Sequence, residues 1–138
     1  MKPEGLKYTT MLRDELPTVR ATMLEVQQRL PDPVAPALAA IINGGGKRLR
    51  PSLVLLSAHM FDAELHYAIP VAAAVEMLHT ATLIHDDLID NALVRRGTRT
   101  LNAQWSAAAT VLTGDVAFAW AAELATRSHN LQVVARFA

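Results

Sequence analysis

The sequence contains no cysteine, which excludes disulfide bonds and thiolate metal sites. Its first ten residues, MKPEGLKYTT, lack the apolar segment of a secretory signal. The longest apolar runs, such as VAFAWAA at residues 116–122, are far shorter than the roughly 20 residues of a transmembrane helix. Acidic and basic residues balance at 13 each, which gives no reason to expect a nucleic acid as partner. From these absences we expect a cytoplasmic protein with no transmembrane segment.

Aromatic residues make up only 5% of the chain, whereas alanine and leucine supply much of its 51% hydrophobic content. This composition, without strand-like alternation or hairpin turns, predicts a single all-α domain over residues 1–138. Pro17 should kink or restart the first helix, Pro51 and Pro70 suit the starts of the third and fourth, and the glycines at 44–46 end the second. The expected helices span residues 6–30, 31–43, 52–61, 71–90, 102–127 and 131–138.

Three aspartates gather near the end of the fourth helix, in LIHDDLID at residues 83–90. Helix geometry places Asp86 and Asp90 on one face, with Asp87 beside them. Like charges at these spacings repel by roughly 0.2–0.5 kcal/mol per pair, and the helix dipole disfavours anions at this end. We therefore expect a cation there, and oxygen ligands suit Mg²⁺. The alternative is a solvated acidic helix end.

Basic residues cluster in two other segments. NGGGKRLRP, at residues 43–51, combines glycines that let the backbone approach an anion with three cations, Lys47, Arg48 and Arg50. This is not a Walker loop, because no GKS or GKT follows the glycines and no strand precedes them. Arg95 and Arg96 follow the aspartate helix. Taken singly, each segment could be a loop with solvated charges.

Taken together, the segments describe one site. His79 lies two turns before Asp86 on nearly the same stripe, although alone it would be an ordinary helix histidine. Carboxylates would hold Mg²⁺, Mg²⁺ would hold a diphosphate, and the two basic groups would hold phosphates. The protein would then neutralise and position a leaving diphosphate.

This combination of motifs resembles the trans-isoprenyl diphosphate synthases, also called polyprenyl synthetases. The resemblance rests on GGGKRLRP, HTATLIHDDLIDNALVRRG and VLTGD in that order, and it extends from about Asp32 to Ala138. It implies the N-terminal half of a bundle of antiparallel helices around a central cavity, and a homodimer as the intact enzyme. It also implies that an allylic prenyl diphosphate ionises with help from Mg²⁺ and is then attacked by the double bond of isopentenyl diphosphate.

The resemblance assigns the expected site. The first aspartate-rich motif, which binds Mg²⁺, would be Asp86, Asp87 and Asp90. The contact to the allylic diphosphate would come from Arg95. Isopentenyl diphosphate would be bound by Lys47, Arg50, His79 and Arg96. The wall that controls product length would include Ala81 and Thr82, both small, so we expect products longer than farnesyl diphosphate.

Other polar residues receive no catalytic role. Arg48 is expected to be a surface cation, and Asp115 in the TGD motif to be structural. Ordinary surface or core histidines are expected at His59, His66 and His129. Thr82 lies one turn before Asp86 on the same stripe, whereas Ala81 is about 140° away and is placed in the wall only by the resemblance.

Full members of the family are longer and carry a second aspartate-rich motif, which is missing here. We therefore expect the chain to be the N-terminal portion of a longer synthase domain and to be inactive alone. Two alternatives remain open. The chain could be a non-catalytic subunit of a two-component prenyltransferase, or a helical metal-binding scaffold protein with an accidental motif.

Overall fold

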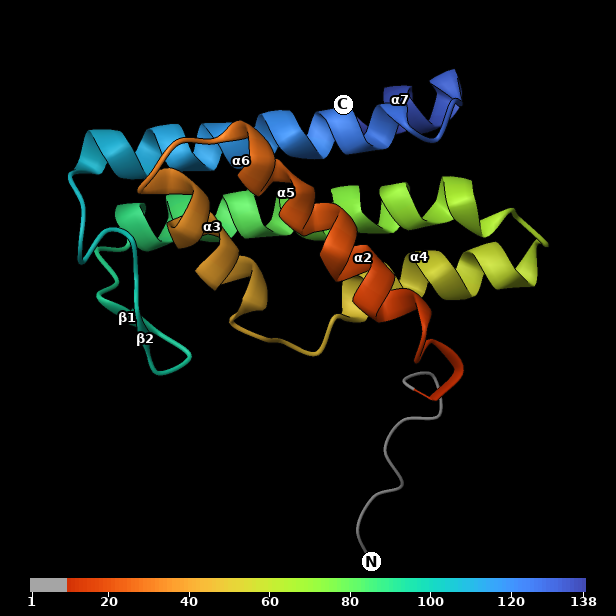
Figure 1. Ribbon diagram of the computed structural model, residues 1–138, viewed down its shortest axis with the longest axis horizontal. Helices are drawn as coiled ribbons and strands as arrows, with labels where there is room; N and C mark the ends of the chain where they lie inside the picture. Colours follow the sequence, from red (N-terminus) through yellow and green to blue (C-terminus); the bar gives the residue numbers. More distant parts are fainter. Residues whose placement is uncertain (1–9) are drawn as a thin grey trace, which may run out of the picture.

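The chain folds around one long helix. The structure, a computed structural model, describes residues 10–138. Helix α5 has α6 along one side and α4 along the other, and α2 and α3 cross obliquely over one face of this layer (Figure 1). Its elements are α2 (Glu15–Leu24), the 3-10 helix η1 (Glu25–Arg29), α3 (Val34–Asn43), α4 (Leu49–Met60), α5 (Leu65–Ile89), β1 (Val94–Arg95), β2 (Thr98–Arg99), α6 (Ala107–Thr126) and α7 (Leu131–Phe137).

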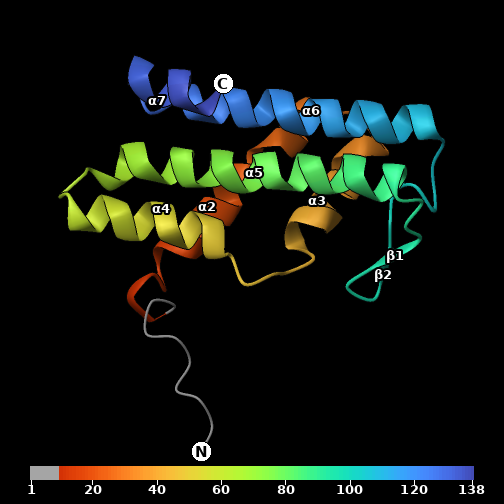
Figure 2. The ribbon, with the colours of Figure 1, turned by 180° about the vertical axis from the view of Figure 1, so that it is seen from behind.

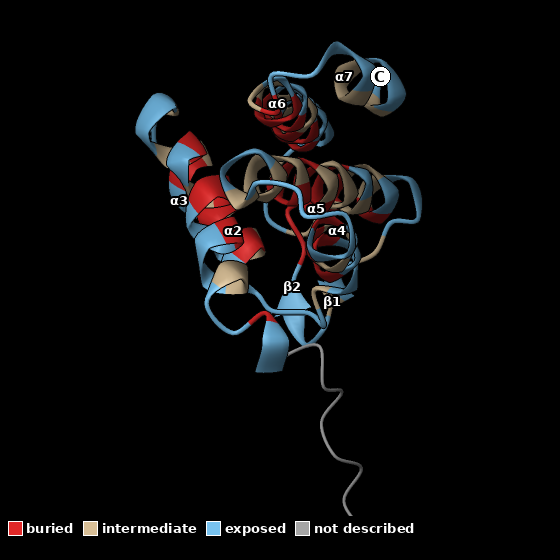
Figure 3. Cartoon of the chain, turned by 90° about the vertical axis from the view of Figure 1, so that its right-hand side faces the viewer, coloured by how far each residue is buried: buried red, intermediate tan, exposed pale blue. Residues whose placement is uncertain are grey.

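The opposite face of α5 is open. Seen from behind, α4, α5 and α6 lie side by side with no described helix in front of them (Figure 2). The buried sides of α2 and α3 are turned toward α5, whereas their outer sides are exposed (Figure 3). The core therefore lies on one side of α5, and the other side of this helix is available to solvent.

Small residues bring α5 and α6 close together. Fully buried alanines occur on both helices, and they are Ala72, Ala73, Ala74, Ala81, Ala117, Ala121 and Ala125. Gly114 on α6 faces His85, and a Cβ at Gly114 would lie 2.1 Å from His85 Nε2. Trp120 adds a tie to α2, because its indole Nε1 donates a 3.1 Å hydrogen bond to the Met23 carbonyl. This close packing fixes how α5 is rotated within the bundle.

The all-α fold class expected from the sequence is confirmed, and each expected helix ends within one residue of the observed end, whereas the starts of α3, α4, α5 and α6 differ from the expected ones by three to six residues. Residues 6–9 of the first expected helix lie outside the described residues. Pro17 falls in the first turn of α2, which begins at Glu15, so the predicted restart is confirmed. The placement of Pro70 at a helix start is wrong, because α5 begins at Leu65 and continues through the proline. Leu65 and Ile69 pack against the core, and this packing outweighs the one backbone hydrogen bond that proline removes.

A short antiparallel hairpin was not predicted. Strands β1 and β2 pair Val94 with Arg99 and Arg95 with Thr98. Arg96 and Gly97 form the turn with φ of 51° and 78°, the double positive φ that suits the right-handed twist of a two-residue hairpin. The Thr100 hydroxyl closes the base with a 2.7 Å hydrogen bond to the Ala92 carbonyl. The hairpin folds back toward α5 and carries both arginines with it.

By length and composition alone, α5 and α6 are each long and apolar enough to cross a membrane. In the fold, 50% of the tested α5 segment and 39% of the α6 segment are buried. Long core helices of helical bundles meet the same criterion, so this finding is weak evidence for a membrane span. The expectation of no transmembrane segment considered uninterrupted apolar runs only, and it stays a prediction.

Candidate functional site

The three aspartates of α5 do not share one environment. Asp86 and Asp90 are exposed on the open side of the helix, whereas Asp87 is 7% exposed. Neighbouring residues of a helix are about 100° apart, so Asp86 and Asp87 must point in different directions. Within residues 10–138, no three His, Cys, Asp or Glu side chains are grouped to hold a metal ion. The predicted metal site therefore has two carboxylates on the open face and one turned inward.

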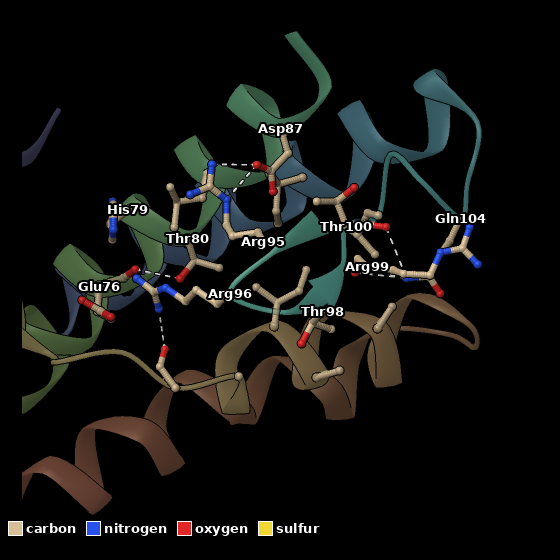
Figure 4. Close-up of a pocket in the computed structure, with 18 of the residues that line it drawn as sticks. Glu76, His79, Thr80, Asp87, Arg95, Arg96, Thr98, Arg99, Thr100 and Gln104 are labelled. Atoms are coloured by element: carbon tan, nitrogen blue, oxygen red, sulfur yellow. Dashed lines mark hydrogen bonds and ion pairs between the residues drawn. The ribbon is translucent and has the colours of Figure 1, made fainter. Parts of the chain in front are cut away.

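Asp87 is joined to the hairpin. Its Oδ1 accepts hydrogen bonds from Nε and Nη2 of Arg95, both at 2.7 Å (Figure 4). The hairpin turn places Arg95 here, because β1 runs back alongside the end of α5. Such a charge-assisted pair fixes the direction of the guanidinium. Arg95 is thus held at the end of the aspartate helix.

Arg96 connects the hairpin to the glycine loop at residues 44–46. Its Nη1 donates a 2.7 Å hydrogen bond to the Gly45 carbonyl. Gly45 and Gly46 have φ of 88° and 136°, which L side chains rarely adopt, and a Cβ at Gly46 would lie 2.7 Å from Arg96 Nη1. The glycines therefore serve a close approach of the loop to an arginine as well as the turn itself.

Arg48 is not the surface cation that was predicted. Its side chain is 19% exposed, and its Nη1 lies 2.7 Å from Oε1 of Glu76. Its Nη2 also donates to the Ile42 carbonyl at the end of α3. Arg48 has a φ of 50° at the N-terminus of α4, and this left-handed backbone turns the side chain inward. Sequence spacing gave no signal for the pair, because Glu76 is 28 residues away.

A pocket of about 300 Å³ brings together the groups predicted to bind isopentenyl diphosphate. We call it the basic pocket. Its lining includes all four predicted residues, Lys47, Arg50, His79 and Arg96, and also Gly46, Arg48, Leu49 and Glu76. Lys47 and Arg50 are exposed and His79 is half-buried. Three sequence segments that were predicted to form one site therefore meet in space.

A second pocket, of about 260 Å³, lies beside the basic pocket and shares Arg48, Glu76, His79 and Arg96 with it. We call it the inner pocket. It is enclosed by α3, α5 and the hairpin, and Asp87 and Arg95 belong to its wall (Figure 4). Its apolar lining comes from Ala37, Ala40, Ile41, Leu83, Ile84 and Leu101.

The surroundings of His79 favour its neutral form. Burial lowers the pKa of this imidazole, and the positive charge of Arg50 lowers it further. Glu76 raises the pKa of His79, while Arg96 and Arg95 add smaller lowering effects. A neutral imidazole can still donate one hydrogen bond to a phosphate oxygen. In this form it adds no charge to a pocket that already contains several cations.

The two residues expected in the product-length wall differ in position. Thr82 is exposed on the same side of α5 as Asp86, and its hydroxyl donates a 2.7 Å hydrogen bond to the His79 carbonyl. Ala81 is 0% exposed and belongs to the core. Thr82 therefore fits an open wall beside the aspartates, whereas Ala81 lies among packed side chains of the described bundle.

Other polar residues lie outside both pockets. Asp115 is exposed, and its Oδ1 lies 3.5 Å from Nε2 of His85, a residue for which the sequence predicted no role. His85 also bonds the Val111 carbonyl at 3.0 Å and so ties α5 to α6. The remaining histidines, all exposed, are His59, His66 and His129.

Comparison with known proteins identifies the family. The polyprenyl synthetase family matches residues 32–138, and the chain belongs to this family. It is 42% identical to the octaprenyl diphosphate synthase of Escherichia coli K12 over 94 residues, which are 68% of this chain and 29% of that protein. It is 39% identical to heptaprenyl diphosphate synthase component 2 of Geobacillus stearothermophilus over 110 residues, 80% of this chain and 34% of that protein. The chain thus spans about a third of these relatives.

Solved structures show the same fold. The decaprenyl diphosphate synthase of Rhodobacter capsulatus superimposes with a TM-score of 0.86 at 34% identity, over 95% of this chain and 41% of that one. A polyprenyl synthase of Caulobacter crescentus CB15, crystallised with calcium and isoprenyl diphosphate, gives a TM-score of 0.84 at 34% identity, over 94% of this chain and 40% of that one. The resemblance inferred from the motifs is confirmed, and the alternative of an accidental motif in an unrelated helical scaffold is wrong.

Proposed function

We propose that this chain supplies the substrate-binding portion of a polyprenyl diphosphate synthase. The enzyme joins isopentenyl diphosphate head-to-tail to an allylic prenyl diphosphate. The observation that carries the proposal is the basic pocket. Its four predicted residues, Lys47, Arg50, His79 and Arg96, come from the glycine loop, the start of α4, the aspartate helix and the hairpin turn. A pocket with this charge is suited to a diphosphate.

The groups of the basic pocket differ in what they do. Lys47, Arg50 and Arg96 neutralise the charge of isopentenyl diphosphate, and His79 donates a hydrogen bond as a neutral imidazole. Arg96 is held by its bond to Gly45, so little side-chain freedom remains to be lost when the substrate binds. The pocket would thereby present the substrate in one fixed orientation.

The open face of α5 is suited to the metal-assisted half of the reaction. Asp86 and Asp90 are exposed there one helical turn apart, and hard carboxylate oxygens with room for further oxygen ligands fit Mg²⁺. When bound, Mg²⁺ supplies positive charge to the departing diphosphate. Asp87 fits this metal less well, because Arg95 occupies its Oδ1. Its role would be to aim Arg95, whose two bonds to Asp87 leave Nη1 for a phosphate oxygen.

Further properties belong to the same proposal. The enzyme would be a cytoplasmic homodimer, and the residues beside the aspartates would allow products longer than farnesyl diphosphate. After Asp90 the only acids in the sequence are Asp115 and Glu123, which do not form a second aspartate-rich motif. We therefore expect these 138 residues alone not to catalyse the condensation.

A second candidate is a subunit of a two-component prenyltransferase. It is favoured by the similarity to a protein named as component 2 of a heptaprenyl diphosphate synthase. Purification of a tagged protein at its natural full length distinguishes the two. A single species with activity supports the synthase, whereas activity that requires a second, different chain supports the two-component enzyme.

The direct test is an assay of the full-length protein with Mg²⁺, isotopically labelled isopentenyl diphosphate and geranyl or farnesyl diphosphate. We expect labelled prenyl diphosphates longer than the allylic substrate. Absence of elongation with every allylic substrate, by a folded protein and in the presence of any co-purifying partner, would rule out the proposed function.

A further inference from the structure

Among the described residues that line the basic pocket, Glu76 is the one acid. Its side chain is only 9% exposed, so water screens its charge weakly. An unpaired carboxylate here would repel an incoming diphosphate. It would also compete for the cations Lys47, Arg50 and Arg96 that line the same pocket. A pocket that binds anions must therefore pair this carboxylate with a positive charge.

Arg48 supplies this positive charge. Arg48 Nη1 lies 2.7 Å from Glu76 Oε1, and the same guanidinium donates to the Ile42 carbonyl. The backbone carbonyl of Arg48 accepts a 2.7 Å hydrogen bond from the Ser52 hydroxyl and a 3.1 Å bond from the Ser52 amide. Both ends of the residue are thus fixed.

The KRLR segment divides its cations between two tasks. Lys47 and Arg50 are exposed, whereas Arg48 between them is turned inward by its left-handed backbone. The division follows from local geometry, because a residue with a φ of 50° at the start of α4 projects differently from its neighbours. Arg48 therefore pairs with the internal carboxylate of Glu76, and Lys47 and Arg50 remain at the mouth of the pocket.

We propose that Arg48 is a positioning residue of the basic pocket, the counter-charge that prevents Glu76 from repelling the diphosphate or capturing the cations that bind it. This inference rests on the proposed binding of diphosphates in the same pocket. Glu76 in turn holds Arg48, and through it the glycine loop, against α5. The pair therefore sets both the geometry and the net charge of the site.

If Arg48 acts as a counter-charge to Glu76, two conservative variants should change the affinity for an anion in opposite directions. In Glu76→Gln the amide oxygen can still accept a hydrogen bond from Arg48, but the negative charge is gone, so affinity for an anion should rise. In Arg48→Met the carboxylate is left unpaired beside the pocket, so affinity should fall. If the pair served only to hold the fold together, both variants would weaken binding.

The test uses inorganic pyrophosphate as the probe and isothermal titration calorimetry of the full-length protein. Divalent cations are removed, so that Asp86 and Asp90 do not contribute. We expect Arg48→Met to weaken pyrophosphate binding about tenfold, and Glu76→Gln to tighten it by a factor of about three to ten, as befits one unit charge near a partly buried anion. The double variant should return to near the affinity of the wild type.

Thermal unfolding of the same variants separates positioning from folding. Both single substitutions break a buried pair, so both should lower Tm even though their affinities move in opposite directions. Arg127→Met is the matched control. Arg127 lies 2.7 Å from Glu25 outside both pockets, so its loss should lower Tm without changing the affinity for pyrophosphate.

The outcomes distinguish the two proposals. A folded wild type that does not bind pyrophosphate overturns the proposed diphosphate site, and this inference with it. Binding by the wild type, with Glu76→Gln and Arg48→Met both weaker, overturns the counter-charge role alone and leaves the proposed function in place.

Discussion

Arg96 Nη1 donates a 2.7 Å hydrogen bond to the Gly45 carbonyl, and a Cβ at the next residue, Gly46, would lie 2.7 Å from that same nitrogen. The glycine loop and the hairpin are therefore in direct contact at the basic pocket. A side chain at position 46 must displace the guanidinium, and it must also adopt a φ of 136°.

We expect Gly46→Ala to weaken binding of isopentenyl diphosphate, seen as a KM raised about tenfold, because Arg96 loses its position. The strained backbone should also cost about 1–3 kcal/mol of unfolding free energy. Gly45→Ala is the matched control. Its φ is 88° and no atom lies within 4 Å of the added Cβ, so it should lose stability with little change in KM. Equal KM values for the two variants would contradict the close-contact explanation.

Asp86→Asn and Asp90→Asn should each lower kcat of the full-length enzyme by about 10²–10³, the usual cost of removing one electrostatic contact to developing charge. Asp62→Asn is the control, because Asp62 is exposed outside both pockets and asparagine tolerates its φ of 52°. Steady-state rates with Mg²⁺ decide the matter. Similar rates for all three variants would show that the open face of α5 is not the metal site.

His79 should make stability depend on pH. Burial, followed by Arg50, lowers its pKa in the folded protein below the ordinary 6.5. The unfolded chain therefore takes up a proton at a higher pH than the folded chain. The contribution of neutral His79 to the free energy of unfolding is fully present above pH 6.5. It is lost as the pH falls through and below that value.

Denaturant unfolding at pH 7.5 and pH 5.5 measures this effect. The wild type should lose more unfolding free energy on acidification than His79→Gln, whereas His66→Gln, at an exposed position, should follow the wild type. A pH dependence shared by all three proteins would mean that His79 is not the responsible group.

Thr82→Phe should shorten the products of the full-length enzyme, because an aromatic ring on the exposed stripe below Asp86 fills space that a growing chain needs. Chromatography of the products, compared with those of the wild type, gives the answer. Ala81→Phe would place the same ring in the core and should destabilise the fold by about 1–3 kcal/mol. An unchanged product distribution in a stable Thr82→Phe enzyme would place the wall elsewhere.

The 138 residues alone should not elongate any allylic diphosphate, because they contain no second aspartate-rich motif. The isolated chain is incubated with Mg²⁺, isopentenyl diphosphate and farnesyl diphosphate, with the octaprenyl diphosphate synthase of Escherichia coli K12 as positive control. Sustained formation of longer prenyl diphosphates by the isolated chain would show that the second motif is dispensable.

The sequence predicted the helices and most of the candidate site, since both depend on local patterns. Apolar periodicity and the glycine break locate α3 to within three residues, and they locate the end of α6 to within one residue, although its start was expected five residues too early. The hairpin escaped prediction because strands of two residues are too short to show an alternating pattern. Pro70 was misplaced because tertiary packing of Leu65 and Ile69 outweighed a local rule.

The prediction that Arg48 is a surface cation was wrong for a different reason. A charged residue among charged neighbours is normally solvated, and only its left-handed backbone and a distant glutamate turn it inward. Neither feature leaves a signal in the local sequence. The buried pair with Glu76 is therefore a property of the fold, as is the contact between Gly114 and His85.

Asp86 and Asp87 are adjacent in the chain, but their side chains point to different sides of α5. Asp86 is exposed to the aqueous side, whereas Asp87 stands in the wall of the inner pocket with Arg95. The close packing of small residues between α5 and α6 prevents α5 from rotating about its axis. Neither carboxylate can therefore take the position of the other. Loss of the carboxylate at Asp87 would therefore release Arg95, whereas loss of the carboxylate at Asp86 would remove a negative charge from the exposed face and leave Arg95 in place.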